Sequence, residues 1–109
     1  TLPGMKATTC QSGRDVSVNG NPIRVSEMLA TLDGPVYIER VSVDSAPNVI
    51  KAKKAIKKAL ECQMKGLGYS FVEVVSSCPT NWGLDPLDSL KFIEEKMLPE
   101  FPLGVIRDK

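Results

Sequence analysis

The fold is decided by the stretch Phe71-Val72-Glu73-Val74-Val75-Ser76-Ser77-Cys78-Pro79-Thr80-Asn81-Trp82-Gly83. Its first half predicts a buried strand, because β-branched residues pack well in a pleated sheet. Pro79 lacks an amide hydrogen and biases Cys78 toward an extended backbone. In open α/β sheets, ligands bind where the strands end. We therefore expect this strand in the core and Cys78 at its tip.

The residues around Cys78 leave its role open. Most free cysteines are small buried apolar groups. The alternative is a thiolate with a redox or metal-binding role, since loops at strand tips often carry function. A nucleophilic thiol activated by a nearby helix N-terminus is a third interpretation. No second cysteine lies near Cys78, so the CxxC pair typical of metal sites is absent.

The rest of the chain predicts helices alternating with strands. Residues 1–21 have no apolar period and are expected to form a loop, whereas residues 22–109 are expected to form an α/β core. Asn21 and Pro22 are suitable residues to begin a helix, and Asp85 and Pro86 another. The expected elements are a helix over 22–32, a strand over 36–43, a helix over 47–65, the strand from 71, and a helix over 86–98.

This α-β-α-β-α order favours two parallel strands joined by right-handed helical crossovers. Two strands are too few for a stable open sheet. The missing strands are expected upstream in a longer protein or in a second copy, which makes a homodimer of this chain an open alternative. The apolar tail from Phe101 to Ile106 is expected to pack on this domain or a neighbour.

Two faces are predicted for the longest helix. Its buried stripe is expected to contain Val49, Ala52, Ala55, Ile56, Ala59, Leu60 and Met64.

In the last predicted helix, the buried face is expected to contain Leu87, Leu90, Ile93 and Met97.

Lysines crowd the other side of the longest helix, at Lys51, Lys53, Lys54, Lys57 and Lys58. Lysines usually form a solvated surface. The functional alternative is a docking patch for an acidic protein, centred on Lys54, Lys57 and Lys58, because a local cluster raises association rates. A free-standing module that binds an acidic partner through residues 51–58 is therefore a second functional hypothesis.

Composition excludes several classes of function. The chain has 109 residues, enough for one domain, and a net charge of +1, which gives no overall attraction to nucleic acid or membrane. It has no histidine, which argues against a self-contained hydrolase. Three distant cysteines and no apolar run of membrane-spanning length favour a reducing, cytoplasmic setting.

Several motifs in order resemble the thiamine-diphosphate-binding (beta) subunit of 2-oxoacid:ferredoxin oxidoreductases. The resemblance covers nearly the whole chain. It rests on the stretch 71–83, on Leu84-Asp85-Pro86 and Phe101-Pro102-Leu103-Gly104, and at the front on Gly4-Met5-Lys6-Ala7-Thr8-Thr9 and Gly13-Arg14-Asp15. The upstream CxxC cluster site and the Gly-Asp-Gly motif of that family are absent. The chain therefore looks like the C-terminal part of one thiamine-diphosphate-binding, Rossmann-like domain.

The resemblance implies roles for particular residues. Cys78 corresponds to a ligand of a 4Fe-4S cluster, although Ser77 stands where proline often stands in relatives. Thr8 and Thr9 correspond to a segment beside the thiamine diphosphate pocket, and Lys54, Lys57 and Lys58 become candidates for docking acidic ferredoxin. Cys10 and Cys62 have no such role and are expected to be structural.

The function implied is CoA-dependent oxidative decarboxylation of a 2-oxoacid, with electrons passing through iron-sulfur clusters to ferredoxin. Thiamine diphosphate, Mg²⁺ and the other oxidoreductase subunits would complete the enzyme. Branched-chain oxoacids, 2-oxoglutarate and pyruvate all remain open as substrates. Residues 1–109 alone are expected to be inactive and to bind none of these cofactors, since most of the cluster ligands and the magnesium motif lie elsewhere.

Overall fold

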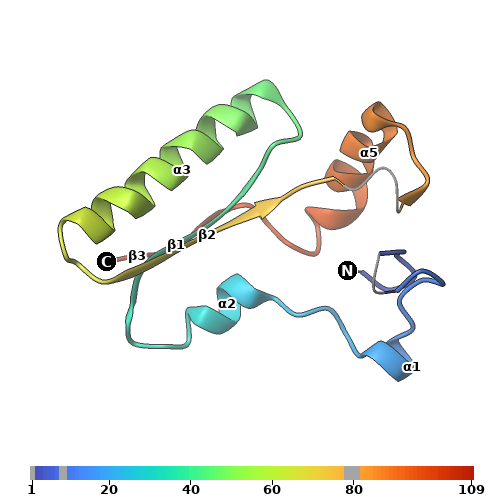
Figure 1. Cartoon of the computed structure of the whole chain (residues 1–109), viewed down its shortest axis with the longest axis horizontal. Helices are drawn as coiled ribbons and strands as arrows, with labels where there is room; N and C mark the ends of the chain where they lie inside the picture. The colour runs from blue at the N-terminus through green and yellow to red at the C-terminus, as the bar shows by residue number, and fades with distance from the viewer. Residues whose placement is uncertain (1, 8–9, 78–81) are drawn as a thin grey trace.

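A computed structural model describes residues 2–7, 10–77 and 82–109 of the chain. Within these residues, a three-stranded sheet forms the centre, in the order β2 (Tyr69–Val75), β1 (Pro35–Ser42), β3 (Gly104–Asp108). Helix α3 (Ala46–Met64) lies along one face, and α2 (Val25–Leu29) lies under the other (Figure 1). Helix α5 (Pro86–Phe92) lies beyond the end of β2 (Figure 1). Within the described residues, no helix is long and apolar enough to cross a membrane.

The two predicted strands are present and parallel. β1 spans Pro35–Ser42, β2 spans Tyr69–Val75, and α3 (Ala46–Met64) connects them. The expected α/β class and the helical crossover between parallel strands are therefore confirmed. Ser45 caps α3, because its side chain accepts a hydrogen bond from the backbone N–H of Asn48.

A third strand forms where only a packed tail was expected. β3 (Gly104–Asp108) runs antiparallel to β1 and covers the edge of β1 that faces away from β2. Gly104 has a φ of 137°, a conformation that glycine adopts without steric cost, at the point where the tail joins the sheet. Exposure does not alternate along these five residues, so sequence periodicity did not distinguish this strand from an apolar coil.

Helix α3 faces the sheet with small residues. Its buried positions are Ala52, Ala55, Ala59 and Cys62. The prediction that Ile56, Leu60 and Met64 belong to the buried stripe is wrong, since their exposed fractions are 46%, 56% and 87%. The row of alanines lets the helix axis approach the strands closely, and this rotation leaves the larger side chains on the flank of the helix.

The second face carries α2, which is shorter than expected. α2 spans Val25–Leu29 and follows a single turn, α1 (Val16–Asn19), within the otherwise irregular first segment. The prediction of a helix beginning at Pro22 is wrong. The guanidinium of Arg14 donates hydrogen bonds to the carbonyls of Asn19, Gly20 and Asn21, and these contacts hold the chain in a loop before the helix.

The last predicted helix is present with a change of geometry. α5 (Pro86–Phe92) begins at the expected cap, where the Asp85 carboxylate accepts from the N–H of Asp88 at 2.8 Å. It continues into the π-helical turn η1 (Ile93–Met97). Ile93 is fully buried as predicted, but Leu87 is 73% exposed, so its assignment to the buried face is wrong.

Candidate functional site

The carboxyl ends of β1 and β2 lie side by side, because Ser42 is the register partner of Val75. Asp44 follows the tip of β1 and is only 8% exposed. Its Oδ1 accepts hydrogen bonds from the Ser42 hydroxyl and from the Asn48 amide, the latter at 2.8 Å. Burial alone would raise the pKa of Asp44, but these hydrogen bonds outweigh burial and the pKa lies below its ordinary value.

An arginine buried within the sheet lies just before this tip. Arg40 has a side chain with no exposed surface. Its Nε lies 2.5 Å from Oε2 of Glu73, its register partner on β2. Its two terminal nitrogens reach Oε1 and Oε2 of Glu27 on α2 at 2.6 and 2.5 Å. The three side chains are called the Arg40 cluster here.

The Arg40 cluster joins four parts of the chain. The Ser26 hydroxyl donates to Glu73 at 2.8 Å, and the carbonyl of Pro102 accepts from Arg40 at 3.2 Å. The Phe101 ring lies 5.4 Å from the guanidinium carbon. The hydrogen bonds that Arg40 donates to Glu27 lower the pKa of this carboxyl group. The cluster therefore fixes α2, β1, β2 and the start of β3 relative to one another.

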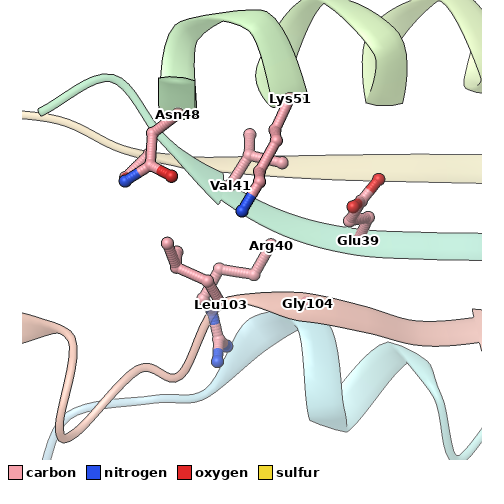
Figure 2. A pocket seen from close by; sticks show the side chains of 8 residues that line it. Glu39, Arg40, Val41, Asn48, Lys51, Leu103 and Gly104 are labelled. Carbon is pink, nitrogen blue, oxygen red and sulfur yellow. The ribbon is translucent and has the colours of Figure 1, made fainter. Parts of the chain in front are cut away.

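A hollow of about 150 Å³ lies on the α3 side of the same strand. Asn48 and Lys51 of α3 reach toward it, Glu39 and Val41 of β1 line its floor, and Leu103 and Gly104 border it from the tail, while the Arg40 side chain points away toward α2 (Figure 2). Tyr37, two residues before Glu39, donates its hydroxyl hydrogen to that carboxylate. Burial, followed by this hydrogen bond, raises the pKa of Tyr37. The hollow is small and carries one charge of each sign.

The lysines of α3 are divided between two environments. Lys54 and Lys57 are exposed. Lys58 forms an ion pair with Asp108 of β3, and its ammonium lies 4.9 Å from the centre of the Tyr37 ring. Lys51 borders the hollow just described. All three candidate lysines are therefore exposed, but Lys58, with 45% of its side chain exposed, is ion-paired to β3 whereas Lys54 and Lys57 are not among the ion pairs of the described residues.

Three candidate residues, Thr8, Thr9 and Cys78, lie outside the described residues. Their neighbours are placed: β2 ends at Val75, and Ser76 after it is exposed. Cys62 is buried against Tyr37 and Ala59, in agreement with the expected structural role. Cys10 is half-buried, and its thiol donates to the carbonyl of Gly13 at 3.0 Å.

The described residues do not assemble a metal site by themselves. Among residues 2–7, 10–77 and 82–109, no group of three or more Asp, Glu, Cys or His side chains is arranged to hold a metal ion. Asp44 has an oxygen committed to Ser42 and Asn48, and both carboxylates of the Arg40 cluster are committed to the guanidinium. An iron-sulfur cluster or a magnesium diphosphate would need ligands beyond these residues.

Sequence reasoning missed the Arg40 cluster and Asp44. A signal for the cluster was present, since Arg40 and Glu73 each interrupt an apolar strand, and a charge at a buried strand position needs a partner. Their partnership depends on strand register, which the sequence does not specify. Asp44 directly follows the first strand, a position that could have marked it as a helix-capping or site residue.

Comparisons with known proteins give a consistent result. The chain is 46% identical over all 109 residues to ketoisovalerate oxidoreductase subunit VorA of Methanothermobacter marburgensis. It is 45% identical over the same length to the subunit of that name from Methanothermobacter thermautotrophicus. In both cases the chain spans 23% of the length of the relative. No family model matches the chain. No solved structure matches it either.

Proposed function

We propose that this chain is part of a 2-oxoacid oxidoreductase subunit that acts on ketoisovalerate. The observation that carries the proposal is the 46% identity to a ketoisovalerate oxidoreductase subunit, which extends over every residue of the chain. Ketoisovalerate is chosen over pyruvate and 2-oxoglutarate because it is the substrate in the names of both relatives. The α/β fold with two parallel strands agrees with this assignment.

The proposed reaction joins the acyl group of the decarboxylated oxoacid to coenzyme A and passes two electrons to ferredoxin. Thiamine diphosphate would supply the carbanion chemistry when bound. We propose that Cys78 supplies one thiolate ligand to a 4Fe-4S cluster and that Thr8 and Thr9 lie beside the cofactor. We propose that the other ligands and the magnesium site come from outside these 109 residues, because the sequence contains neither a CxxC pair nor a Gly-Asp-Gly motif.

The described residues have a positioning role in this proposal. The Arg40 cluster binds β2 to β1 and α2 just before β2 ends at Val75, three residues before Cys78 in the sequence. Asp44 fixes the adjacent tip of β1 to the start of α3. A rigid pair of strand ends would hold the cysteine at a constant distance from ligands on other segments. The exposed Lys54 and Lys57, with Lys58, would contact ferredoxin.

A chimera tests the proposal. The matching quarter of the Methanothermobacter marburgensis subunit is replaced by this chain and assembled with its partner subunits. CoA-dependent oxidation of ketoisovalerate is expected to persist, with pyruvate and 2-oxoglutarate as poorer substrates. The same chimera with Cys78→Ala is expected to lose iron, sulfide and most of its electron transfer, whereas Cys62→Ala serves as the thiol control. An inactive but correctly assembled chimera would contradict the proposal.

The isolated chain and the lysines provide two further readouts of the same experiment. Purified residues 1–109 are expected to be colourless and not to bind thiamine diphosphate, so a brown preparation containing iron and sulfide would count against the proposed division of ligands.

Replacing Lys54, Lys57 and Lys58 by Gln in the chimera is expected to slow ferredoxin reduction and to weaken its salt dependence. Unchanged salt dependence would remove the lysines from the ferredoxin contact.

A further inference from the structure

The outer edge of β2 has few of the features that protect an edge strand. Among the described residues, β2 lies at the end of the sheet order and pairs only with β1. The strand contains no proline or lysine, since its sequence is Tyr69-Ser70-Phe71-Val72-Glu73-Val74-Val75. Its one charge is on Glu73, whose carboxylate binds Arg40. Exposed apolar edges promote pairing with another strand, and natural proteins normally protect them. β2 therefore has the composition of an interior strand.

The layer above the sheet is also incomplete on this side. The side-chain amide of Gln63 on α3 donates a hydrogen bond to the hydroxyl of Ser70 on β2 at 3.2 Å. The flank of α3 that carries Gln63 therefore lies over β2. Ile56 and Leu60 share that flank by helical spacing and are 46% and 56% exposed. The opposite flank is covered differently, since Lys58 pairs with Asp108 on β3. The exposed apolar side chains of α3 thus overhang the open edge.

The layer below the sheet has a matching hollow. A space of about 240 Å³ is bordered by residues 73–76 at the end of β2 and by Ile23, Met97 and Phe101. Phe101 lies against Arg40, so this hollow is on the face opposite α3. A strand placed beside β2 would direct alternate side chains toward Ile56 and Leu60 on one face and toward this hollow on the other.

We propose that the open edge of β2 receives a further β-strand, parallel to β2, from the region of VorA-type subunits outside the matched quarter. That region is more than three times as long as this chain, since the chain spans 23% of the relatives. A parallel strand is proposed because β2 is apolar on both faces, as strands in parallel sheets are. The proposed occupant is an apolar strand. A helix directly before or after that strand would cover Ile56 and Leu60.

A second copy of the chain fits the edge less well. On α3, Lys57 lies between Ile56 and Leu60 in the sequence, and Lys53 lies one turn before Ile56. Both lysines are exposed. If a two-fold axis perpendicular to the sheet paired β2 with β2 of a second copy, both α3 helices would lie on the same face and their lysine-bearing flanks would face one another. Like charges disfavour such a contact. The inference rests on the relationship to VorA but not on any cofactor or on turnover.

Hydrogen exchange tests the inference without using activity. The backbone amides of residues 69–75 are compared between the isolated chain and the chimera described above. About half of these amides point outward, and they are expected to exchange at least tenfold more slowly in the chimera. Co-expression of this chain with the remaining region of the marburgensis subunit is expected to yield a one-to-one complex. Equal exchange in both proteins, or failure of the two pieces to associate, would overturn the inference.

Substitutions locate the contact. Ile56→Lys with Leu60→Lys is expected to abolish association of the two pieces and to leave the circular dichroism of the isolated chain unchanged, because both positions are exposed there. Leu87→Lys is the matched control, since Leu87 is 73% exposed and belongs to α5 rather than to α3 or β2. If the isolated chain is instead a dimer that the double substitution dissociates, a second copy occupies the edge and the proposal is wrong.

Discussion

The two faces of the same small sheet are held by different interactions. On the face under α3, alanines and a cysteine pack against Tyr37, Val41 and Val72, and the contacts are apolar and close. On the opposite face, the largest fully buried side chain is Arg40, held between Glu27 and Glu73. The first face depends on shape and the second on charges that must all be paired.

This difference predicts different sensitivities to mutation. An apolar face built from small residues tolerates loss of exposed groups but resists added volume. A buried ion cluster contributes little net free energy when complete, yet it is costly when one member is removed, since the remaining charges stay buried without a partner. Mutations on the two faces can therefore test whether the sheet is held together in these two ways.

The largest effect is expected from Arg40→Ala. Removing the guanidinium leaves two carboxylates near each other without a cation. Because their side chains are 39% and 25% exposed, solvent screens part of the repulsion, and we expect the free energy of unfolding to fall by about 3 kcal/mol, the lower end for a buried pair. Urea unfolding followed by circular dichroism measures this change. The matched control is Arg24→Ala, because Arg24 pairs with Glu100 at the surface, with side-chain exposures of 49% and 42%. The control should cost at most about 1 kcal/mol. Equal losses would show that the cluster has no special importance.

A smaller effect is expected on the other face from Ala55→Leu. Ala55 is 2% exposed and packs beside Ala52 and Val41, so the added carbon atoms must push α3 away from the strands. We expect a loss of about 1–3 kcal/mol in the same unfolding experiment. Lys54→Leu adds the same side chain one residue earlier, at an exposed position, and should change stability by no more than about 0.5 kcal/mol. A stable Ala55→Leu protein would mean that this face is loosely packed.

The smallest loss of stability is expected from mild acid. Acid protonates carboxylates, so it should weaken the face held by charges and leave the apolar contacts under α3 unchanged. The hydrogen bonds from Arg40 lower the pKa of Glu27, and Asp44 also has a lowered pKa. A lowered pKa in the folded state contributes stability that is complete above the unfolded pKa and is lost as pH falls through the folded pKa. The melting temperature should therefore decline below the ordinary glutamate pKa of 4.5. Glu27→Gln should lower stability at pH 7 but flatten this acid dependence; an unchanged slope would contradict the explanation.

Local patterns predicted the elements that depend on local chemistry. The predicted helix start at Asp85 follows from a side chain that accepts a hydrogen bond from a nearby backbone N–H, and this cap is found. The parallel arrangement of β1 and β2 followed from the helical length between them. These features require only neighbouring residues or the length of a connection.

Features that depend on distant residues were not predicted. The rotation of α3 depends on how closely alanines can approach the sheet, so the larger Ile56 and Leu60 were wrongly assigned to the core. The partnership of Arg40 with Glu73 depends on register, and that of Arg40 with Glu27 depends on a helix whose start was misplaced by three residues, from 22 to 25. Each requires a three-dimensional arrangement that periodicity alone does not provide.

The late position of β3 in the sequence has a consequence for synthesis. The unit β1-α3-β2 is complete once residue 75 has left the ribosome, whereas the strand that covers the other edge of β1 comes from residues 104–108. Between these points the nascent chain exposes β1 on that side, and an unpaired strand invites misassembly. A polypeptide that ends prematurely within residues 76–103 would therefore be prone to aggregate, although it contains every helix and strand up to β2.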